Sequence, residues 1–329
     1  MLSILRRACG LLIAMSAFGL GAVIPAHADD YPSHSIRLVV PFPPGGATDT
    51  VARLMADSMA KYLKQPIVVT NRGGAGAIIG AETVAQAEPD GYTILYTTAG
   101  VHVINPAIYP HLPYDPVKSF TFVGLTNGAP LVLTVLADSP FKNVQELIAY
   151  AKAHPGKLSY GSAGVGTSLN QSGEMFKQAA KVDILHVPYK GAGPALVDFL
   201  AGRVSMMFGY VGSALPNVKS GKVRILAIGS PKRLPLIPDV PTVGEVLGLS
   251  DYDADTWTGI AAPAGTPAAV VEKLNQAIAH ALQDNKKYLL DNGYVILGGS
   301  PQEMQAKVTK QLQTLTPFMA KVMGKAKAQ

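Results

Sequence analysis

The residue types at positions 36–49 combine a strand with a loop that could bind an anion. Residues 36–40 form a short apolar run with β-branched members, which predicts a buried strand. Three prolines and two glycines follow at 41–46 and interrupt both strand pairing and helix. Thr48 or Asp49 is then expected to cap a helix with regular apolar spacing. Such a loop directs free backbone N–H groups and the positive end of a helix dipole at one point, where an anion can bind without a side-chain cation.

The same arrangement recurs later in the chain. A strand at 158–160 is followed by a loop of Gly, Ser and Thr at 161–168, and then by a helix that continues through Phe176. Taken alone, either loop is equally well explained as a tight connection between a strand and a helix. The repetition predicts an anion-binding turn in each of two domains, and we expect the two turns to face each other across one cleft.

Residues that catalysis, cofactors or metals require are sparse. The loop at 73–76 follows a strand, but the third glycine of a dinucleotide-binding loop would fall at Ile79. No Gly-x-Ser-x-Gly motif is present around Ser162 or elsewhere. The six histidines after residue 28 lack metal-ligand spacing, and we expect each to lie at the surface or to be satisfied singly. We therefore expect no catalytic residue, no metal and no cofactor.

The first 28 residues have the pattern of a secretory signal peptide. Arg6 and Arg7 precede an apolar stretch that extends to Ile24, and residues 26–28 read Ala-His-Ala. We expect cleavage after Ala28 and export to the periplasm, with an uncleaved membrane anchor as the alternative. No later stretch approaches about 18 uninterrupted apolar residues, the length that a membrane-spanning helix needs.

The remainder of the chain is long enough for two domains with proper cores. The only cysteine is Cys9, so the exported protein must rely on packing instead of disulfides. Removal of the two arginines lowers the formal net charge of +6 to a mildly basic value. Because Lys and Arg do not cluster, nucleic acid is not expected as a partner.

Strands and helices alternate from residue 36 onward, which is typical of an α/β fold. Strands at 36–40, 66–70 and 92–96, with helices between them, predict a parallel sheet covered by helices. Ligands bind beyond the carboxyl ends of such strands, where the loop at 97–100 would also lie. Further strands are expected at 122–125, 131–135, 158–160, 184–189, 204–208, 223–229 and 257–262, and further helices at 143–153, 195–201, 213–219, 267–283 and 301–321.

Eight short motifs, in one order along the chain, together resemble the solute-binding proteins of tripartite tricarboxylate transporters, the Bug family. Each motif alone is weak, and their shared order makes the resemblance specific. They are Tyr-Pro-x-x-x-Ile-Arg-Leu-Val-Val-Pro-Phe at 31–42, Gly-Gly-x-Thr-Asp at 45–49, Asn-Arg-x-Gly-Ala-Gly at 71–76, Pro-Asp-Gly-Tyr at 89–92, Tyr-Gly-Ser-Ala-Gly at 160–164, His-Val-Pro-Tyr-Lys-Gly at 186–191, Pro-Thr at 241–242 and Ala-Pro-Ala-Gly-Thr-Pro at 262–267.

The resemblance implies a periplasmic-binding-protein fold of the second type. This α/β fold has two domains, each a mainly parallel sheet flanked by helices, with the ligand in the cleft between them. Two crossing strands join the domains. The implied boundaries are a signal peptide at 1–28, the first part of domain 1 at 29–129, domain 2 at 130–228, and a return to domain 1 with the C-terminal helices at 229–329.

The resemblance also implies a function without bond chemistry. The protein would capture a carboxylate, either a di- or tricarboxylate or an aromatic dicarboxylate such as terephthalate, and deliver it as a monomer to the membrane subunits of a tripartite transporter. Phe42, Tyr189, Tyr210 and Trp257 are candidates to line the apolar middle of the cleft, and each is also a candidate for the core. The residues expected to bind the ligand are Phe42, Gly45, Gly46, Ala47, Thr48, Asp49, Thr98, Ala99, Ser162, Gly164, Gly166, Thr167, Ser168, Tyr189 and Tyr210.

Two departures from the family pattern bear on the ligand. Asn170 stands where many relatives have His, and Gly209 stands where relatives commonly have Asp. The loss of an acid removes a partner for a substrate amine and favours a purely acidic ligand, unless position 209 lies outside the pocket. Two other functions stay open at this point: a periplasmic ligand sensor for a signalling partner, and an exported hydrolase with Ser162 as nucleophile.

Overall fold

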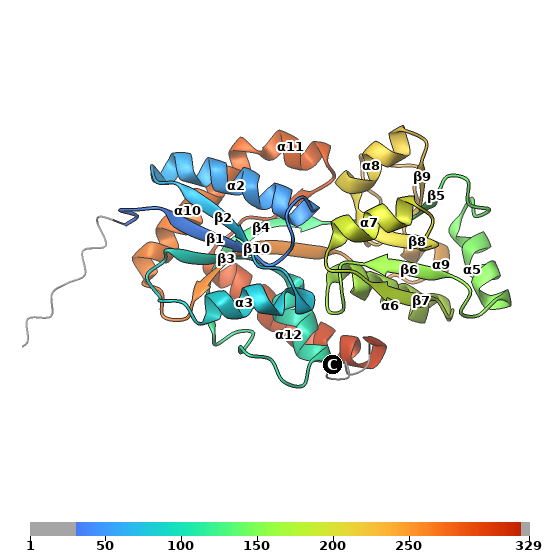
Figure 1. The fold of residues 1–329 in the computed structure, drawn as a ribbon, viewed down its shortest axis with the longest axis horizontal. Coiled ribbons are helices and arrows are strands. Elements are labelled where there is room, and N and C mark those ends of the chain that lie inside the picture. Colours follow the sequence, from blue (N-terminus) through green and yellow to red (C-terminus); the bar gives the residue numbers. More distant parts are fainter. Residues whose placement is uncertain (1–30, 324–329) are drawn as a thin grey trace, which may run out of the picture. The chain divides into compact units, whose positions relative to one another are not determined.

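Two β-sheets, each covered by helices, make up the part of the chain that the computed structural model describes, residues 31–323 (Figure 1). The expected signal peptide and its cleavage site after Ala28 lie outside these residues. The described chain from Pro32 onward forms one compact unit. Within the described residues, no helix combines the length and the apolar composition needed to cross a membrane.

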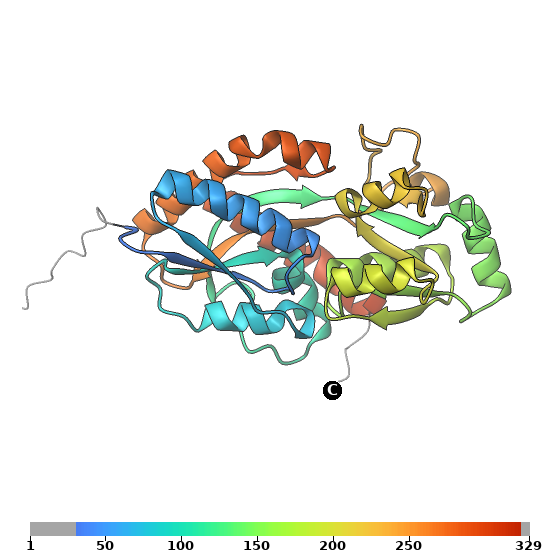
Figure 2. The ribbon, with the colours of Figure 1, turned by 45° about the horizontal axis from the view of Figure 1, so that its top comes forward.

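The first sheet has the strand order β11-β4-β10-β3-β1-β2. Figures 1 and 2 show α2 on one side of this sheet and α3 on the other. Its strands are β1 (Ile36–Val40), β2 (Ile67–Asn71), β3 (Thr93–Thr98), β4 (Phe120–Ala129), β10 (Thr256–Pro263) and β11 (Val295–Ile296). Its helices are α2 (Ala47–Leu63), η2 (Ala75–Ala77), α3 (Ile78–Ala85), η3 (Gly100–Ile104), α4 (Asn105–Ile108), α10 (Ala268–Asp284), α11 (Lys286–Asp291) and α12 (Pro301–Met323).

The second sheet has the strand order β7-β6-β8-β5-β9. One face packs on α5, α6 and α9 through a core that includes Tyr160, Phe176 and Phe208, and the other face packs on α7 and α8. Its strands are β5 (Leu131–Leu136), β6 (Ser159–Ser162), β7 (Leu185–Pro188), β8 (Met206–Tyr210) and β9 (Val223–Ile228). Its helices are α5 (Val144–Ala153), α6 (Ser168–Ala180), α7 (Ala192–Leu200), α8 (Val211–Lys219) and α9 (Val243–Leu247).

The chain passes between the two sheets along two neighbouring segments. β4 continues into β5 with only Pro130 between them, and the chain returns through residues 229–255 into β10. The Gly229 N–H donates to the Leu131 carbonyl (2.7 Å), and Thr256 pairs with Ala129. The expected α/β fold with two sheets and two crossing strands is confirmed, whereas the domain boundaries at 129/130 and 228/229 stay a prediction.

The sheets are mixed, which corrects the expectation of mainly parallel sheets. β1 pairs in parallel with β2 and β3, but β10 pairs antiparallel with β3 and β4. In the second sheet β6 pairs in parallel with β7 and β8, while β5 pairs antiparallel with β8 and β9. The strands that cross between the sheets cause this, because β5 and β10 enter their sheets directly instead of through a helical crossover.

Several element boundaries also differ from the expectation. The residue that caps α2 is Gly46, and neither Thr48 nor Asp49 has that role. β3 continues through Thr98, so two residues of the expected loop at 97–100 belong to the strand. Helices α7 and α8 begin at Ala192 and Val211, earlier than predicted, and α11 and β11 were not predicted. The Asn143 side chain caps α5 by accepting a hydrogen bond from the Glu146 N–H.

Candidate functional site

One pocket is lined by both glycine-rich loops, the loop between β1 and α2 and the loop between β6 and α6. Strands from both sheets therefore end at this pocket, as the rule for parallel strands predicts. We call it the anion pocket. Eight of the residues expected to bind a ligand line it: Phe42, Gly46, Ala47, Thr48, Thr98, Thr167, Ser168 and Tyr210.

Three helices begin at the anion pocket. Gly46 precedes α2, Thr167 precedes α6 and Gly191 precedes α7, and residues of each first turn line the pocket. The first N–H groups of a helix have no partner within the helix. Gly46 and Gly191 provide no side-chain cap for α2 and α7. The pocket therefore collects backbone N–H donors and the positive ends of three helix dipoles.

No charged side chain is found among the described residues that line the anion pocket. An anion bound here would be held by backbone N–H groups and by the hydroxyl groups of Thr, Ser and Tyr. This is the electrostatic arrangement in which a helix terminus replaces a cation.

The loop before α2 is held in shape by Asp49. This carboxylate is buried and accepts hydrogen bonds from the Gly45 N–H (2.9 Å), Arg53 Nε (3.0 Å) and Asn71 Nδ2 (2.7 Å). Burial alone would raise the pKa of Asp49, but the hydrogen bonds outweigh it and the pKa lies below its ordinary value. Gly45 has a φ of 83°, a conformation that favours glycine. Asp49 thus stabilises the loop through hydrogen bonds but does not itself line the anion pocket.

The loop before α6 is held in a similar way by Ser162 and Asn170. Ser162 Oγ accepts a hydrogen bond from the Gly164 N–H (3.1 Å), and Asn170 Oδ1 accepts one from the Gly166 N–H (3.2 Å). The Thr167 hydroxyl donates to the Gly164 carbonyl (2.7 Å). These bonds occupy N–H groups inside the loop, and the Thr167 hydroxyl also accepts a hydrogen bond from the Asn170 N–H at the start of α6. The N–H groups of Ser168 and Leu169, which line the pocket, have no partner within the helix.

Ser162 also contacts a histidine, which the sequence did not reveal. Ser162 Oγ lies 2.6 Å from His186 Nε2, because the parallel pairing of β6 and β7 places Tyr160 opposite His186. Burial lowers the pKa of His186 to about 4, so the ring is neutral at pH 7. Ser162 is fully buried and lines no described pocket. The Ser162 hydroxyl is therefore not exposed to a ligand in this structure, and it contacts the loop through the Gly164 N–H.

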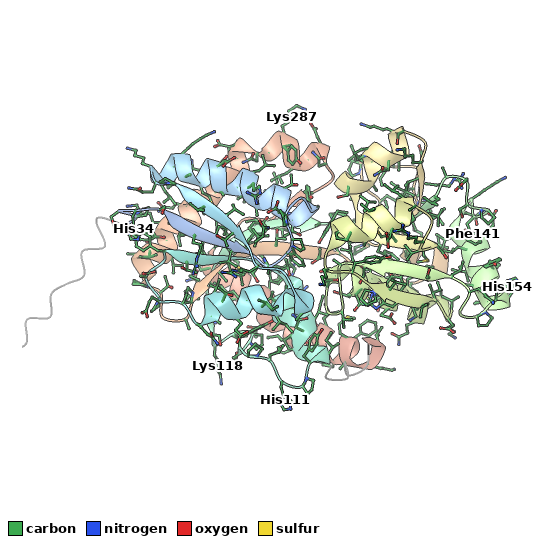
Figure 3. The ribbon with its side chains drawn as sticks, viewed as in Figure 1. His34, His111, Lys118, Phe141, His154 and Lys287 are labelled. Carbon is green, nitrogen blue, oxygen red and sulfur yellow. The ribbon has the colours of Figure 1, made fainter. Side chains whose placement is uncertain are left out.

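The other histidines match the expectation. His34, His111, His154 and His280 are exposed, and Figure 3 shows the first three at the edge of the molecule. His102 is buried, with Nδ1 2.6 Å from the Pro116 carbonyl and Nε2 2.8 Å from Thr97 Oγ1. Burial lowers the pKa of His102 to about 4. Within residues 31–323, no cluster of His, Cys, Asp and Glu is suited to hold a metal ion.

A hydroxyl pair connects the two sides of the anion pocket. The side chains of Tyr210, at the end of β8, and Thr48, in the first turn of α2, are hydrogen-bonded. Burial raises the pKa of Tyr210, and the bond to Thr48 opposes this increase. The phenol is therefore protonated at neutral pH and offers a hydroxyl to the pocket.

Six of the residues expected to bind a ligand line neither the anion pocket nor the adjoining pocket that is described in the next paragraph: Asp49, Ala99, Ser162, Gly164, Gly166 and Tyr189. Tyr189 donates instead to Asp198 Oδ2 (2.9 Å). Trp257 packs in the core of the first sheet, and its Nε1 donates to Gln311 Oε1 (2.7 Å). The sequence analysis missed the first turn of α7, where Gly191, Ala192 and Gly193 line the pocket.

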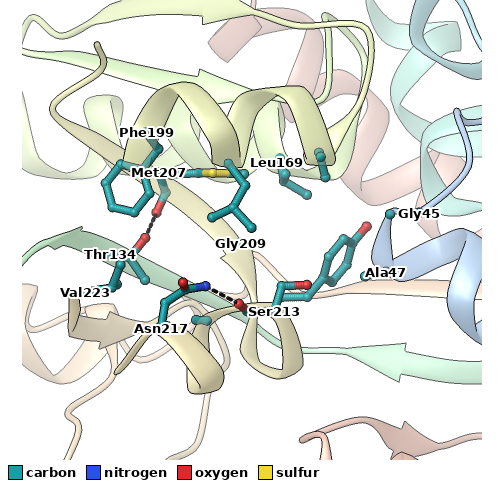
Figure 4. Close-up of a pocket in the computed structure, with 16 residues that line it drawn as sticks. Gly45, Ala47, Thr134, Leu169, Phe199, Met207, Gly209, Ser213, Asn217 and Val223 are labelled. Atoms are coloured by element: carbon teal, nitrogen blue, oxygen red, sulfur yellow. Dashed lines mark hydrogen bonds between the residues drawn. The ribbon is translucent and has the colours of Figure 1, made fainter. Parts of the chain in front are cut away.

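A second pocket adjoins the anion pocket and lies between α7 and α8; we call it the side pocket (Figure 4). The residues that line both pockets are Gly46, Ala47, Leu169, Ala192, Gly193 and Tyr210. Gly45 lines the side pocket but not the anion pocket. Most of its remaining wall is apolar, and such residues cannot be told from ordinary core in the sequence.

Residues 51–323 match the family model of the tripartite tricarboxylate transporter family receptors, TctC. The chain belongs to this family. It is similar to the periplasmic binding protein BugD, with 37% sequence identity, a TM-score of 0.85, and coverage of 90% of this chain and 100% of BugD. The predicted resemblance to the Bug family is thereby confirmed.

Two further relatives were solved with ligands. MatC from Rhodopseudomonas palustris, with bound malate, is 36% identical with a TM-score of 0.83, over 88% of this chain and 100% of MatC. A second protein from that organism, with adipate, is 36% identical with a TM-score of 0.85, over 90% of this chain and 99% of its own. The chain is thus a receptor of the TctC type, a family of periplasmic solute-binding proteins.

Proposed function

We propose that this receptor captures a carboxylate in the anion pocket and delivers it to the membrane subunits of a tripartite transporter. The observation that carries the proposal is the convergence of three helix N-termini on a pocket whose described lining residues include no charged side chain. An ionised carboxylate accepts hydrogen bonds at both oxygens and so matches such a set of donors. The malate and adipate bound by the two relatives support this ligand class.

The number of donors is sufficient for useful affinity. A hydrogen bond to a charged group contributes about 1.5–3 kcal/mol. Micromolar binding corresponds to about 8 kcal/mol, and association costs at least about 4 kcal/mol more. Four to six donors from the first turns of α2, α6 and α7 therefore account for micromolar binding. No bond chemistry is part of this proposal; among the described residues near the loops, Ser162 pairs with His186, and Ser162 is fully buried.

A thermal-shift screen against carboxylic acids tests the ligand class. A ligand at 100 times its dissociation constant adds about 2.7 kcal/mol to the free energy of unfolding, which shifts the midpoint by several degrees. We expect at least one mono-, di- or tricarboxylate to do so, with sodium chloride at equal ionic strength as the control. Equal midpoints with every acid and with the salt would contradict the proposal.

The remaining parts of the proposal concern export and delivery. We propose that the chain acts in the periplasm as a monomer, after cleavage following Ala28. The mass of the protein recovered from the periplasm tests the cleavage site. Uptake of the labelled ligand by cells with the membrane subunits, with and without this receptor, tests delivery. Unchanged uptake without the receptor would favour the alternative, a ligand sensor for a signalling partner.

A further inference from the structure

We infer that the bound carboxylate carries an uncharged apolar arm, alkyl or aryl, and that this arm occupies the side pocket. The inference rests on the proposed function, because the carboxylate head is placed in the anion pocket. It narrows the ligand class to acids with one carboxylate head and an arm that the side pocket can bury.

The side pocket adjoins the anion pocket and shares part of its lining. The first turns of α2 and α7 form the boundary between them, and Figure 4 shows Gly45 and Ala47 at one end of the side pocket. Its cavity volume is about 70 Å³, several times the roughly 10–15 Å³ that one water molecule needs on the same measure, so a short alkyl chain or a single ring has space there. An arm attached to a carboxylate near Ala47, which lines both pockets, would therefore be positioned next to the side pocket.

The walls of the side pocket suit an apolar group. Leu196 and Phe199 of α7, Met207 of β8 and Val223 of β9 are among the residues that line it. None of its described lining residues is Asp, Glu, Lys, Arg or His. A second carboxylate placed here would lose its water without gaining a cation, which is strongly unfavourable.

Two of the polar side chains that line the side pocket donate hydrogen bonds to the protein's own backbone. The Thr134 hydroxyl donates to the Met207 carbonyl (2.8 Å), and Asn217 Nδ2 donates to the Ser213 carbonyl (3.1 Å); both bonds are drawn in Figure 4. These donors are bound to the protein's own backbone, so an apolar arm leaves them satisfied.

Gly209 provides the space for the arm. A Cβ built on Gly209 would meet no heavy atom within 4 Å, and Gly209 is not among the glycines with positive φ. The backbone therefore does not require glycine at this position, and a larger side chain would extend into the open side pocket. The absence of a side chain at 209 sets how much of the pocket an arm can fill.

Calorimetry with acids matched in carbon number tests the inference. The probes are butanoate, hexanoate and octanoate, each compared with the dicarboxylate of equal length: succinate, adipate and suberate. We expect the affinity of the monocarboxylates to rise about fourfold with each methylene. Octanoate should then bind more tightly than suberate, whose second charge would have to enter the apolar pocket.

Variants at two positions locate the arm. Gly209→Val should remove the gain in affinity with chain length, and Gly209→Ala should reduce it if the valine variant fails to fold. Val197→Ala on the outer face of α7, where Val197 is 64% exposed, is the matched control and should keep the full gain.

Three outcomes would overturn the inference. Binding of the dicarboxylates without a gain along the monocarboxylate series would refute the apolar arm and leave the proposed function intact. An equal gain in Gly209→Val and the unmodified receptor would place the arm outside the side pocket. Binding of neither series would refute the proposed function and this inference together.

Discussion

Replacement of Asp49 by Asn separates two effects of this carboxylate on ligand binding. The charge of Asp49 lies close to a pocket proposed to hold an anion, so its loss by itself would strengthen binding. The same carboxylate orders the loop, because it accepts hydrogen bonds from the Gly45 N–H, Arg53 and Asn71. The geometry predicts that the second effect is larger.

The cost to stability can be estimated from these bonds. An amide has one acceptor oxygen, so in Asp49→Asn at least one of the buried donors faces an NH2 group. Loss of a hydrogen bond to a charged group costs about 1.5–3 kcal/mol, and loss of a negative charge in the first turn of a helix costs about 0.3–1 kcal/mol more. The Arg53 side chain is 48% exposed and adds little. We expect the free energy of unfolding to fall by about 2–4 kcal/mol.

Urea unfolding and calorimetry on the same variant measure both consequences. We expect Asp49→Asn to lower ligand affinity at least about tenfold, because the first N–H groups of α2 lose their fixed direction. Asp57→Asn removes the same charge from an exposed position on α2 and should change the free energy of unfolding by less than about 0.5 kcal/mol. Affinity that rises in Asp49→Asn would refute the reasoning, since charge would then outweigh loop order.

Three further predictions concern the loop, the cross-pocket bond and pH. Gly46→Val should weaken binding at least about tenfold in calorimetry at little cost in stability, because its Cβ meets no atom within 4 Å but lies at the anion pocket; unchanged affinity would contradict this. Tyr210→Phe removes the bond to Thr48 and should lower affinity about two- to tenfold, whereas Tyr189→Phe should not. The pKa of His102 is lowered by burial from 6.5 to about 4, so unfolding takes up a proton in this range. Between pH 6.5 and pH 4, the free energy of unfolding should therefore fall by about 3 kcal/mol more in the unmodified protein than in His102→Asn, as measured by urea unfolding. Equal losses in the two proteins would contradict the lowered pKa of His102.

The sequence predicted the strand-loop-helix units well, because they depend on local patterns. β1, the proline- and glycine-rich loop and α2 follow from apolar spacing and from residues that break strands. The prediction that Thr48 or Asp49 caps α2 was wrong. The Asp49 carboxylate accepts a hydrogen bond from the N–H of Gly45, four residues earlier, and Gly46 takes the cap position. Local propensity does not show whether the Asp49 carboxylate caps α2 or instead accepts a hydrogen bond from the Gly45 N–H in the preceding loop.

The parts of the site that could not be predicted depend on contacts between distant segments. Ser162 and His186 meet only because β6 and β7 pair in parallel. The beginning of α7 was placed too late because Gly193 and Pro194 resemble a loop, although proline is tolerated in the first turn of a helix. The side pocket consists of apolar residues whose pattern is the same whether they enclose a cavity or fill a core.

The comparison of an acid with its primary amide tests the central claim most directly. The claim is that uncharged donors at three helix N-termini hold an ionised carboxylate. Calorimetry with the tightest-binding acid of the series and its amide changes charge and acceptors with little change in size. The account predicts that the acid binds and that the amide does not bind measurably, because its NH2 group would face N–H donors. An amide that binds as tightly as the acid would contradict the account.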